Sequence, residues 1–453
     1  MSKVHAVYTS GPIGSRMIRT AFAMLAGTLS MSGYNLADTY FIGRLEGSAP
    51  LAAMGFSLPV IMLIGCIFHG LGNGIMAITA QALGSSRRER AAAFVSAGLL
   101  LVAVFSVVLA VVGMATCRKL FLFFGATGEA LYHVQTYMDI WFFGCFSGAL
   151  AMAGNSLLIG VGDNKAASFS MMGGMIINVI LDPIFIFGWW IFPAMGIRGA
   201  VLATIGSQFC VMLYNLGLLN RKHHLLRFDP IPLKRLLPCW GMSMRYGIPA
   251  MLGMLMMPLA SVVTTKVTAT FGDAAVAATA AAGRLEMVAF VFPMALGMTL
   301  VPMIGQNYGA KLYGRIRDCH RFAMRFAFWY LLFLGILYVL FAPQLVRLFS
   351  RDAEVCRIMA ECMRIIPLGF FAIEIHRYGT FFYTGCGRPN AAAWLNALRI
   401  LGLMIPLTLL ALVFNQLWLV FAARLAADLI SGAVSYLLSK RLILHKIGRE
   451  QPK

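Results

Sequence analysis

Charged residues are scarce in this chain of 453 residues. Asp, Glu, Lys and Arg make up only 12% of it, whereas soluble domains carry about 25%. Hydrophobic residues reach 60%, the mean hydropathy is +0.80, and apolar runs of about 20 residues recur from end to end. This composition excludes a soluble globular protein. Because no strand-like alternation calls for a barrel, it predicts an all-α membrane protein.

Motifs typical of catalytic and metal sites are also missing. The nine cysteines are scattered and none forms a CxxC pair, so neither a disulfide framework nor a zinc site is expected. The sequence contains no GxSxG or HExxH motif, and the adjacent His223 and His224 have no partner motif. We therefore expect neither an enzyme nor a bound cofactor.

The net charge of +20 raises the question of nucleic-acid binding. Most of the Lys and Arg residues, however, lie in short loops between apolar runs, so we expect no nucleic-acid partner. Loops that follow even-numbered runs, together with both chain ends, carry about three times as many Lys and Arg residues as the other loops. The positive-inside rule then predicts a multi-pass membrane protein with both termini in the cytoplasm. We expect it to lie in the bacterial or archaeal cytoplasmic (inner) membrane.

Twelve apolar runs are long enough to cross a bilayer. They cover residues 20–43, 50–83, 91–116, 133–160, 167–191, 199–219, 244–271, 274–307, 322–342, 361–384, 391–414 and 416–438. Residues 220–240 form the most polar stretch and lie at the midpoint of the chain. We expect them to be a cytoplasmic linker between two six-helix lobes, residues 1–219 and 241–453.

The two predicted lobes resemble each other in sequence. Gln81 and Gly84 lie 225 positions before Gln306 and Gly309, and similar matches cluster at other equivalent helix ends. Because six spans separate equivalent positions, both lobes have the same orientation. This predicts a parallel repeat with a pseudo-twofold axis along the membrane normal, in which two lobes could rock about a central cleft.

Two aspartates lie deep inside apolar runs, and neither has a basic neighbour within its own run: Asp38 and Asp182. An ionisable residue at such a depth is costly, so it usually faces a cavity and serves a function. Asn178 shares a helix face with Asp182, and Pro183 leaves the carbonyl of Val179 without its usual donor. Such oxygen ligands suit Na⁺, or a proton shared between two carboxyls.

An architectural hydrogen bond between helices is the alternative interpretation of the aspartate pair. In the repeat, Asp38 falls on Val263 and Asp182 falls on Leu407. A purely architectural bond would be expected in both lobes, so its presence in one lobe favours ion coupling.

Several motifs, in their order and spacing over nearly the whole chain, resemble the multidrug and toxic compound extrusion (MATE) family of transporters. The matching stretches are DTYFIGRLEGSAPLAAMGFSLP, AQALG, GVGDNKAASF, NVILDPIFIFG, GIRGAVLAT, GQNYGA and GCGRPNAAAWLN. The resemblance implies efflux of small organic, often cationic and amphipathic compounds by alternating access, driven by entry of H⁺ or Na⁺. The seventh span contains no Glu, which favours the DinF-like branch.

The resemblance to that branch also implies a site for H⁺ or Na⁺. Its residues carry over onto Asp38, Asn178, Asp182 and Thr204. Members of the branch commonly have a proline where this chain has Ala23, so Gly27 and Gly33 are the expected flexible joints of the first span.

Other side chains indicate a substrate cavity in the first lobe and a polar cluster in the second. Flexible thioethers suit a promiscuous apolar cavity. The candidates for this cavity are Asn35, Asn155, Met171, Met172 and Met175. Arg284 and Glu286 enter the eighth span and are expected to form either a substrate or gating cluster or an internal ion-pair network.

Two other transport classes, a flippase and a channel, fit the sequence less well than an antiporter. A flippase or exporter of lipid-linked or polysaccharide precursors, from a related two-lobe superfamily, is the main alternative, but the first span offers no Lys or Arg to a basic cleft. Two similar but unequal lobes with carboxylates on one side argue against a channel. We expect a monomer whose partners are the lipid bilayer and small organic substrates.

Overall fold

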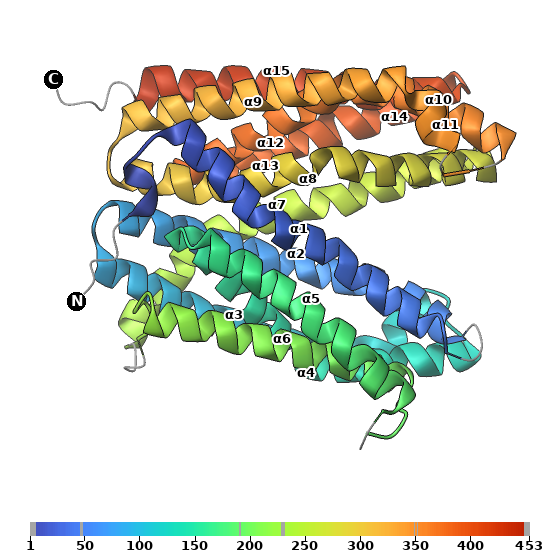
Figure 1. Ribbon diagram of the computed structural model, residues 1–453, viewed down its shortest axis with the longest axis horizontal. Helices are drawn as coiled ribbons and strands as arrows, with labels where there is room; N and C mark the ends of the chain where they lie inside the picture. The colour runs from blue at the N-terminus through green and yellow to red at the C-terminus, as the bar shows by residue number, and fades with distance from the viewer. Residues whose placement is uncertain are drawn as a thin grey trace. The chain divides into compact units, whose positions relative to one another are not determined.

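The computed structural model describes residues 6–45, 49–189, 192–227, 232–347, 349–350 and 352–447, and almost all of them are helical (Figure 1). The helices of the first half are α1 (Ile13–Ile42), α2 (Ala49–Gly84), α3 (Arg88–Phe123), α4 (Gly128–Val161), α5 (Asn164–Phe187) and α6 (Ile197–Arg221). Those of the second half are α7 (Leu233–Ala269), α8 (Asp273–Gly309), α9 (Tyr313–Leu340), α10 (Ala342–Arg347), α11 (Ala353–Ile365), α12 (Phe370–Gly385), α13 (Pro389–Ala397), α14 (Ile405–Val413) and α15 (Leu417–Arg441).

Ten helices within the described ranges are long and apolar enough to cross a membrane. They match ten of the twelve predicted spans. The first predicted span lies in α1. The tenth begins in α11, tightens into a 3₁₀ turn at Ile366–Gly369, which contains Pro367, and continues as α12. The prediction of an all-helical membrane protein is confirmed, whereas the exact number of spans stays a prediction.

The chain divides into two compact units that do not follow the order of the sequence. One unit comprises Met1–Val7 and Phe22–Met251, and the other comprises Tyr8–Ala21 and Leu252–Lys453. The first turns of α1 therefore belong to the second unit, and the first half of α7 belongs to the first. Both boundaries lie inside helices and not in the polar stretch 220–240; the assignment of transport lobes on either side of that stretch stays a prediction.

Glycine allows α2 and α7 to pack closely in the first unit. A Cβ atom on Gly74 would lie 2.5 Å from the backbone nitrogen of Gly247. The hydroxyl of Tyr246 also donates to Gln81 Oε1 over 3.3 Å. Backbone contact of this kind, supported by a hydrogen bond, explains why the first half of α7 lies in this unit.

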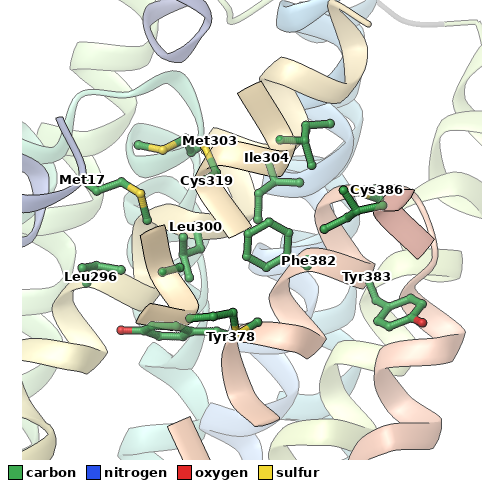
Figure 2. Packing of buried hydrophobic residues seen from close by; sticks show 14 of the residues in the cluster. Met17, Leu296, Leu300, Met303, Ile304, Cys319, Tyr378, Phe382, Tyr383 and Cys386 are labelled. Carbon is green, nitrogen blue, oxygen red and sulfur yellow. The ribbon is translucent and has the colours of Figure 1, made fainter. Parts of the chain in front are cut away.

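The start of α1 is held in the second unit by apolar packing and by polar side chains. Met17 is fully buried in a cluster with Leu296 and Leu300 of α8 (Figure 2). Before the helix, the backbone N–H of Tyr8 donates to Gln306 Oε1 over 3.0 Å, and Asn307 Nδ2 donates to the carbonyl of Tyr8 over 3.1 Å. These side chains pair with the backbone groups of Tyr8, as buried backbone N–H and C=O groups require.

Asp163 fixes the start of α5, the helix that carries Asn178 and Asp182. Its carboxylate accepts a hydrogen bond from the backbone N–H of Ala166 and thereby caps the helix. It also accepts from Lys222 Nζ over 2.6 Å and from His223 Nε2 over 3.0 Å. The hydrogen bond from His223, aided by Lys222 and opposed by partial burial, lowers the pKa of Asp163 from 3.8 to about 2.

Replacing this carboxylate is expected to change the pH dependence of stability. Because the pKa of Asp163 is lower in the folded state, its ionised form stabilises the protein above about pH 4, and this contribution is lost as the pH falls toward 2. At pH 7 we expect Asp163→Asn to lower the free energy of unfolding by about 1 kcal/mol, allowing for solvent screening. The deficit should fall by about half near pH 3.

Unfolding of the detergent-solubilised protein, followed by tryptophan fluorescence between pH 7 and pH 3, measures this effect. Asp352→Asn is the control, because Asp352 caps α11 through the backbone N–H groups of Glu354 and Val355, and Asn also caps helices well. An Asp163→Asn deficit of the same size at pH 7 and pH 3 would contradict the prediction.

Candidate cation site

Three of the predicted site residues meet in the interior of the first unit. Asp38 of α1 is 7% exposed, and Asn178 and Asp182 of α5 are fully buried. Asn178 Nδ2 donates to Asp182 Oδ1 over 3.2 Å, as the spacing of four residues on one helix allows. The carboxyl of Asp38 lies close enough to Asn178 and Asp182 to interact with both electrostatically.

Thr204, the fourth predicted residue, is buried on the neighbouring helix α6 and is 5% exposed. α6 packs closely on α5 on both sides of it. Gly199 of α6 leaves no room for a side chain against the backbone of Phe185, and a Cβ atom on Gly206 would lie 3.4 Å from Leu181 Cδ1. Leu181 is the residue before Asp182.

One oxygen atom of each of these four side chains is buried and has no hydrogen-bond partner among the described residues: Asp38 Oδ1, Asn178 Oδ1, Asp182 Oδ2 and Thr204 Oγ1. A buried polar group without a partner costs about 1–3 kcal/mol, and more if it is charged. Two carboxyls, an amide and a hydroxyl are the donor set that a hard monovalent cation prefers. The same carboxyls could instead share a proton, since two adjacent buried carboxylates resist being ionised together.

Tyr137 was missed by the reasoning from sequence. It is 4% exposed on α4, and its phenol is close enough to Asp38 and Asp182 to interact with both electrostatically. A tyrosine inside an apolar run is more often a core residue, and its spacing from either aspartate carries no signal. Only the packing of α4 reveals it as a candidate site residue.

The predicted cavity methionines lie at the contact between α1 and α5. Met171 Sδ is 3.0 Å from the position that a Cβ atom on Gly27 would take, and Met175 Sδ is 2.8 Å from the corresponding position on Gly33. The backbone N–H of Gly27 also donates to Ser168 Oγ over 2.9 Å. Close packing therefore joins these helices on the approach to Asp38.

The other cavity candidates are placed as follows. Met172 is half-buried on α5. Asn155 of α4 donates through Nδ2 to the carbonyl of Ala167 over 2.8 Å, which ties α4 to the first turn of α5. Asn35 lies in α1, but its side chain is outside those that the structure describes. The role of all five candidates in substrate binding stays a prediction.

The polar residues of the second unit form an ion-pair network. Glu286 forms a hydrogen-bonded ion pair with Arg424. Arg424 Nε lies 3.9 Å from Asp428 Oδ2, and Arg399 Nη2 lies 2.7 Å from Asp428 Oδ1. Arg284 has an exposed side chain. This geometry fits the internal network better than the gating cluster; the part that Arg284 and Glu286 play in transport stays a prediction.

Known proteins resemble this chain over most of its length. The MatE family model matches residues 23–184 and 249–437. The FAD transporter of Shewanella oneidensis is 31% identical over 436 residues, which cover 96% of either chain. The probable multidrug resistance protein YoeA of Bacillus subtilis is 26% identical over 349 residues, covering 76% of this chain and 74% of that protein.

A solved structure supports the same relationship. The crystal structure of the Vibrio cholerae MATE transporter VcmN in its bent form is similar with a TM-score of 0.89 and 29% sequence identity, covering 95% of this chain and 97% of that one. This similarity confirms the predicted two-lobe helical fold. The finer assignment to the DinF-like branch stays a prediction. The chain belongs to the MatE family, whose members are membrane transporters and not enzymes.

Proposed function

We propose that this protein is a secondary active exporter that moves small organic compounds out of the cell by alternating access, in exchange for H⁺ or Na⁺. The observation that carries the proposal is the set of four buried oxygen atoms, on Asp38, Asn178, Asp182 and Thr204, that have no hydrogen-bond partner in the part of the chain that the structure describes. The relative YoeA is named a probable multidrug resistance protein, which is in keeping with export of such compounds. The protein would lie in the inner membrane with both termini in the cytoplasm.

An ion gradient is large enough to drive such transport. One proton that crosses about 100 mV releases about 2.3 kcal/mol, and each pH unit adds about 1.4 kcal/mol. Concentrating a neutral compound a hundredfold costs about 2.7 kcal/mol. One proton per neutral molecule therefore suffices, whereas a cationic compound needs a second proton or must exchange its charge with that of the carboxyls.

The position of Asp38 on α1 suggests how occupancy of the site could be linked to a change of access. α1 begins in the second unit and ends in the first. Ion binding or protonation at Asp38 changes the charge buried beside Asn178 and Asp182, and so changes how closely α1 is held to α5. A helix shared by both units would transmit that change, and each ligand would favour one state only by its difference in affinity for the two.

FAD is a second candidate cargo, because the Shewanella oneidensis relative that is named an FAD transporter is 31% identical to this chain. FAD carries negative charge on its pyrophosphate, in contrast to the cationic compounds of the first candidate. An anionic cargo is already driven outward by the membrane potential, so it would need fewer ions per molecule.

Transport by proteoliposomes with an imposed pH or Na⁺ gradient tests the proposal. Parallel samples would contain a fluorescent organic cation, FAD or a neutral dye, and the rate would be followed with each gradient and with none. We expect a gradient to accelerate transport of at least one cargo, and reversal of the gradient to reverse its direction. Transport driven by ATP without an ion gradient would refute the antiport mechanism.

A further inference from the structure

A groove of about 530 Å³ lies in the second unit, between the start of α1 and the first half of α9. Ile13 and Gly14 line it from α1, and the residues from α9 include Arg321, Arg325 and Trp329. The helices approach closely here, since a Cβ atom on Gly14 would lie 2.7 Å from the ring of Phe322. None of these residues belongs to the cation site.

The groove is positively charged at one end. Arg321 and Arg325 are one helical turn apart, both are exposed, and neither takes part in an ion pair within the described ranges. Asp318 lines the same groove. Two guanidinium groups and one carboxylate leave a single net positive charge. Guanidinium groups bind phosphate oxygens in pairs, which suits a phosphodiester of charge −1.

The other end of the groove is aromatic and continues into an apolar surface. Trp329 is 66% exposed and Phe333, one turn further, is 62% exposed. The rings of Phe326 and Tyr330 stack beneath, with their centroids 5.1 Å apart. From Arg321 to Phe333 the helix rises about 18 Å, which is comparable to the thickness of one leaflet. Arginine, then tryptophan, then apolar residues is the order found from a membrane surface inward.

We propose that this groove binds an anionic phospholipid, whose phosphate lies between Arg321 and Arg325 and whose acyl chain lies along Trp329 and Phe333. Basic pockets between membrane helices bind the headgroups of such lipids. A zwitterionic lipid offers the same chains, but its cationic headgroup opposes the arginines. Ile13 belongs to the first turn of α1, and Asp38 lies near the other end of the same helix. A lipid in the groove would therefore also contact the helix that carries Asp38.

Brominated lipids, which quench tryptophan fluorescence on contact, test this proposal in the full-length reconstituted protein. Vesicles would contain brominated phosphatidylglycerol or brominated phosphatidylcholine at equal mole fraction. The difference between each protein and its Trp329→Phe form isolates the emission of Trp329. One net charge predicts about a fivefold preference for the anionic lipid at this tryptophan.

Arg321→Gln with Arg325→Gln should abolish the preference, while quenching by brominated phosphatidylcholine persists and shows that Trp329 still faces lipid. Lys234→Gln with Arg235→Gln is the control, because it removes two exposed cations at the start of α7 and should leave the preference intact. Equal quenching by both lipids, or a preference that survives the Arg321 and Arg325 substitutions, would overturn the proposal. So would loss of the preference on adding millimolar inorganic phosphate, which would identify a site for free phosphate.

Discussion

Asp38→Asn and Asp182→Asn are each expected to abolish the response of transport to an ion gradient. Asparagine keeps the shape of the side chain, but it cannot release a proton, and it lacks the negative charge with which a carboxylate attracts Na⁺. If the gradient drives accumulation of cargo about one hundredfold across the membrane, loss of the response should bring the ratio of cargo concentrations down to the passive level. This change is the equivalent of about 2.7 kcal/mol. The measurement is cargo uptake into proteoliposomes with an inwardly or outwardly directed pH or Na⁺ gradient.

A structural role for the aspartate pair predicts a different result. If the pair only joins α1 to α5, each substitution would lower stability, and the remaining folded protein would still respond to the gradient. Thermal unfolding of the same samples therefore separates the two roles. Asp352→Asn, which changes an exposed cap of α11, controls for loss of a carboxylate elsewhere. Gradient-driven transport that survives in both Asp38→Asn and Asp182→Asn would remove this site from the mechanism.

Tyr137→Phe extends the test to the residue that the sequence did not reveal. Its phenol lies near both carboxyls, so its removal leaves the charge of the site unchanged and takes away one polar neighbour. We expect a shift in the pH or Na⁺ dependence of transport with the gradient response retained. No shift in either dependence would place Tyr137 outside the site.

Most of the helical fold was predictable from the apolar runs of the sequence, and the centre of the candidate site was predictable from a few individual residues. A lone Asp in an apolar run is costly enough to stand out, and the spacing of Asn178 and Asp182 fixes their common face whatever the surrounding fold. That Asp38 lies within reach of them depends on how α1 packs on α5. The resemblance to the MATE family implied this proximity, but spacing within one helix could not.

The boundaries of the two units were not predictable from the sequence. Polar residues in the stretch 220–240 bind residues of the first unit that are distant in sequence, and do not form a solvated linker. His223 and Lys222 bind the cap of α5 at Asp163, and Trp240 donates to the carbonyl of Ala97 over 2.8 Å. Reasoning from composition treats such residues as solvated linker. Their partners are more than 50 positions away in sequence, so only the folded chain shows that they belong to the first unit.

The sequence alone also does not show which glycines are required for close contact between helices. This chain has 45 glycines, and many have open space where a side chain would be. Gly199 of α6 does not, because a Cβ atom there would overlap the carbonyl of Phe185 in α5. Backbone cannot move aside as a flexible side chain can, so a larger residue would force the two helices apart.

Gly199→Ala is therefore expected to destabilise the protein strongly and to impair transport. Overpacking of this kind costs about 1–3 kcal/mol or more. The displacement would act where Met195 N–H donates to the carbonyl of Phe185 over 3.0 Å, close to Asp182 on α5 and to Thr204 on α6. Thermal unfolding and gradient-driven transport, measured on the same reconstituted samples, report the two consequences separately.

Gly217→Ala on the same helix is the matched control. Apart from the local backbone of α6, no described residue places a heavy atom within 4 Å of the Cβ position there. Alanine is the better helix former by about 1 kcal/mol, so this variant should be as stable as the parent or slightly more so. If Gly199→Ala matched Gly217→Ala in stability and transport, the close contact between α5 and α6 would not hold the site together. A loss of transport in Gly199→Ala at temperatures where it is fully folded would instead show that the spacing of these helices, and not stability alone, is what the site requires.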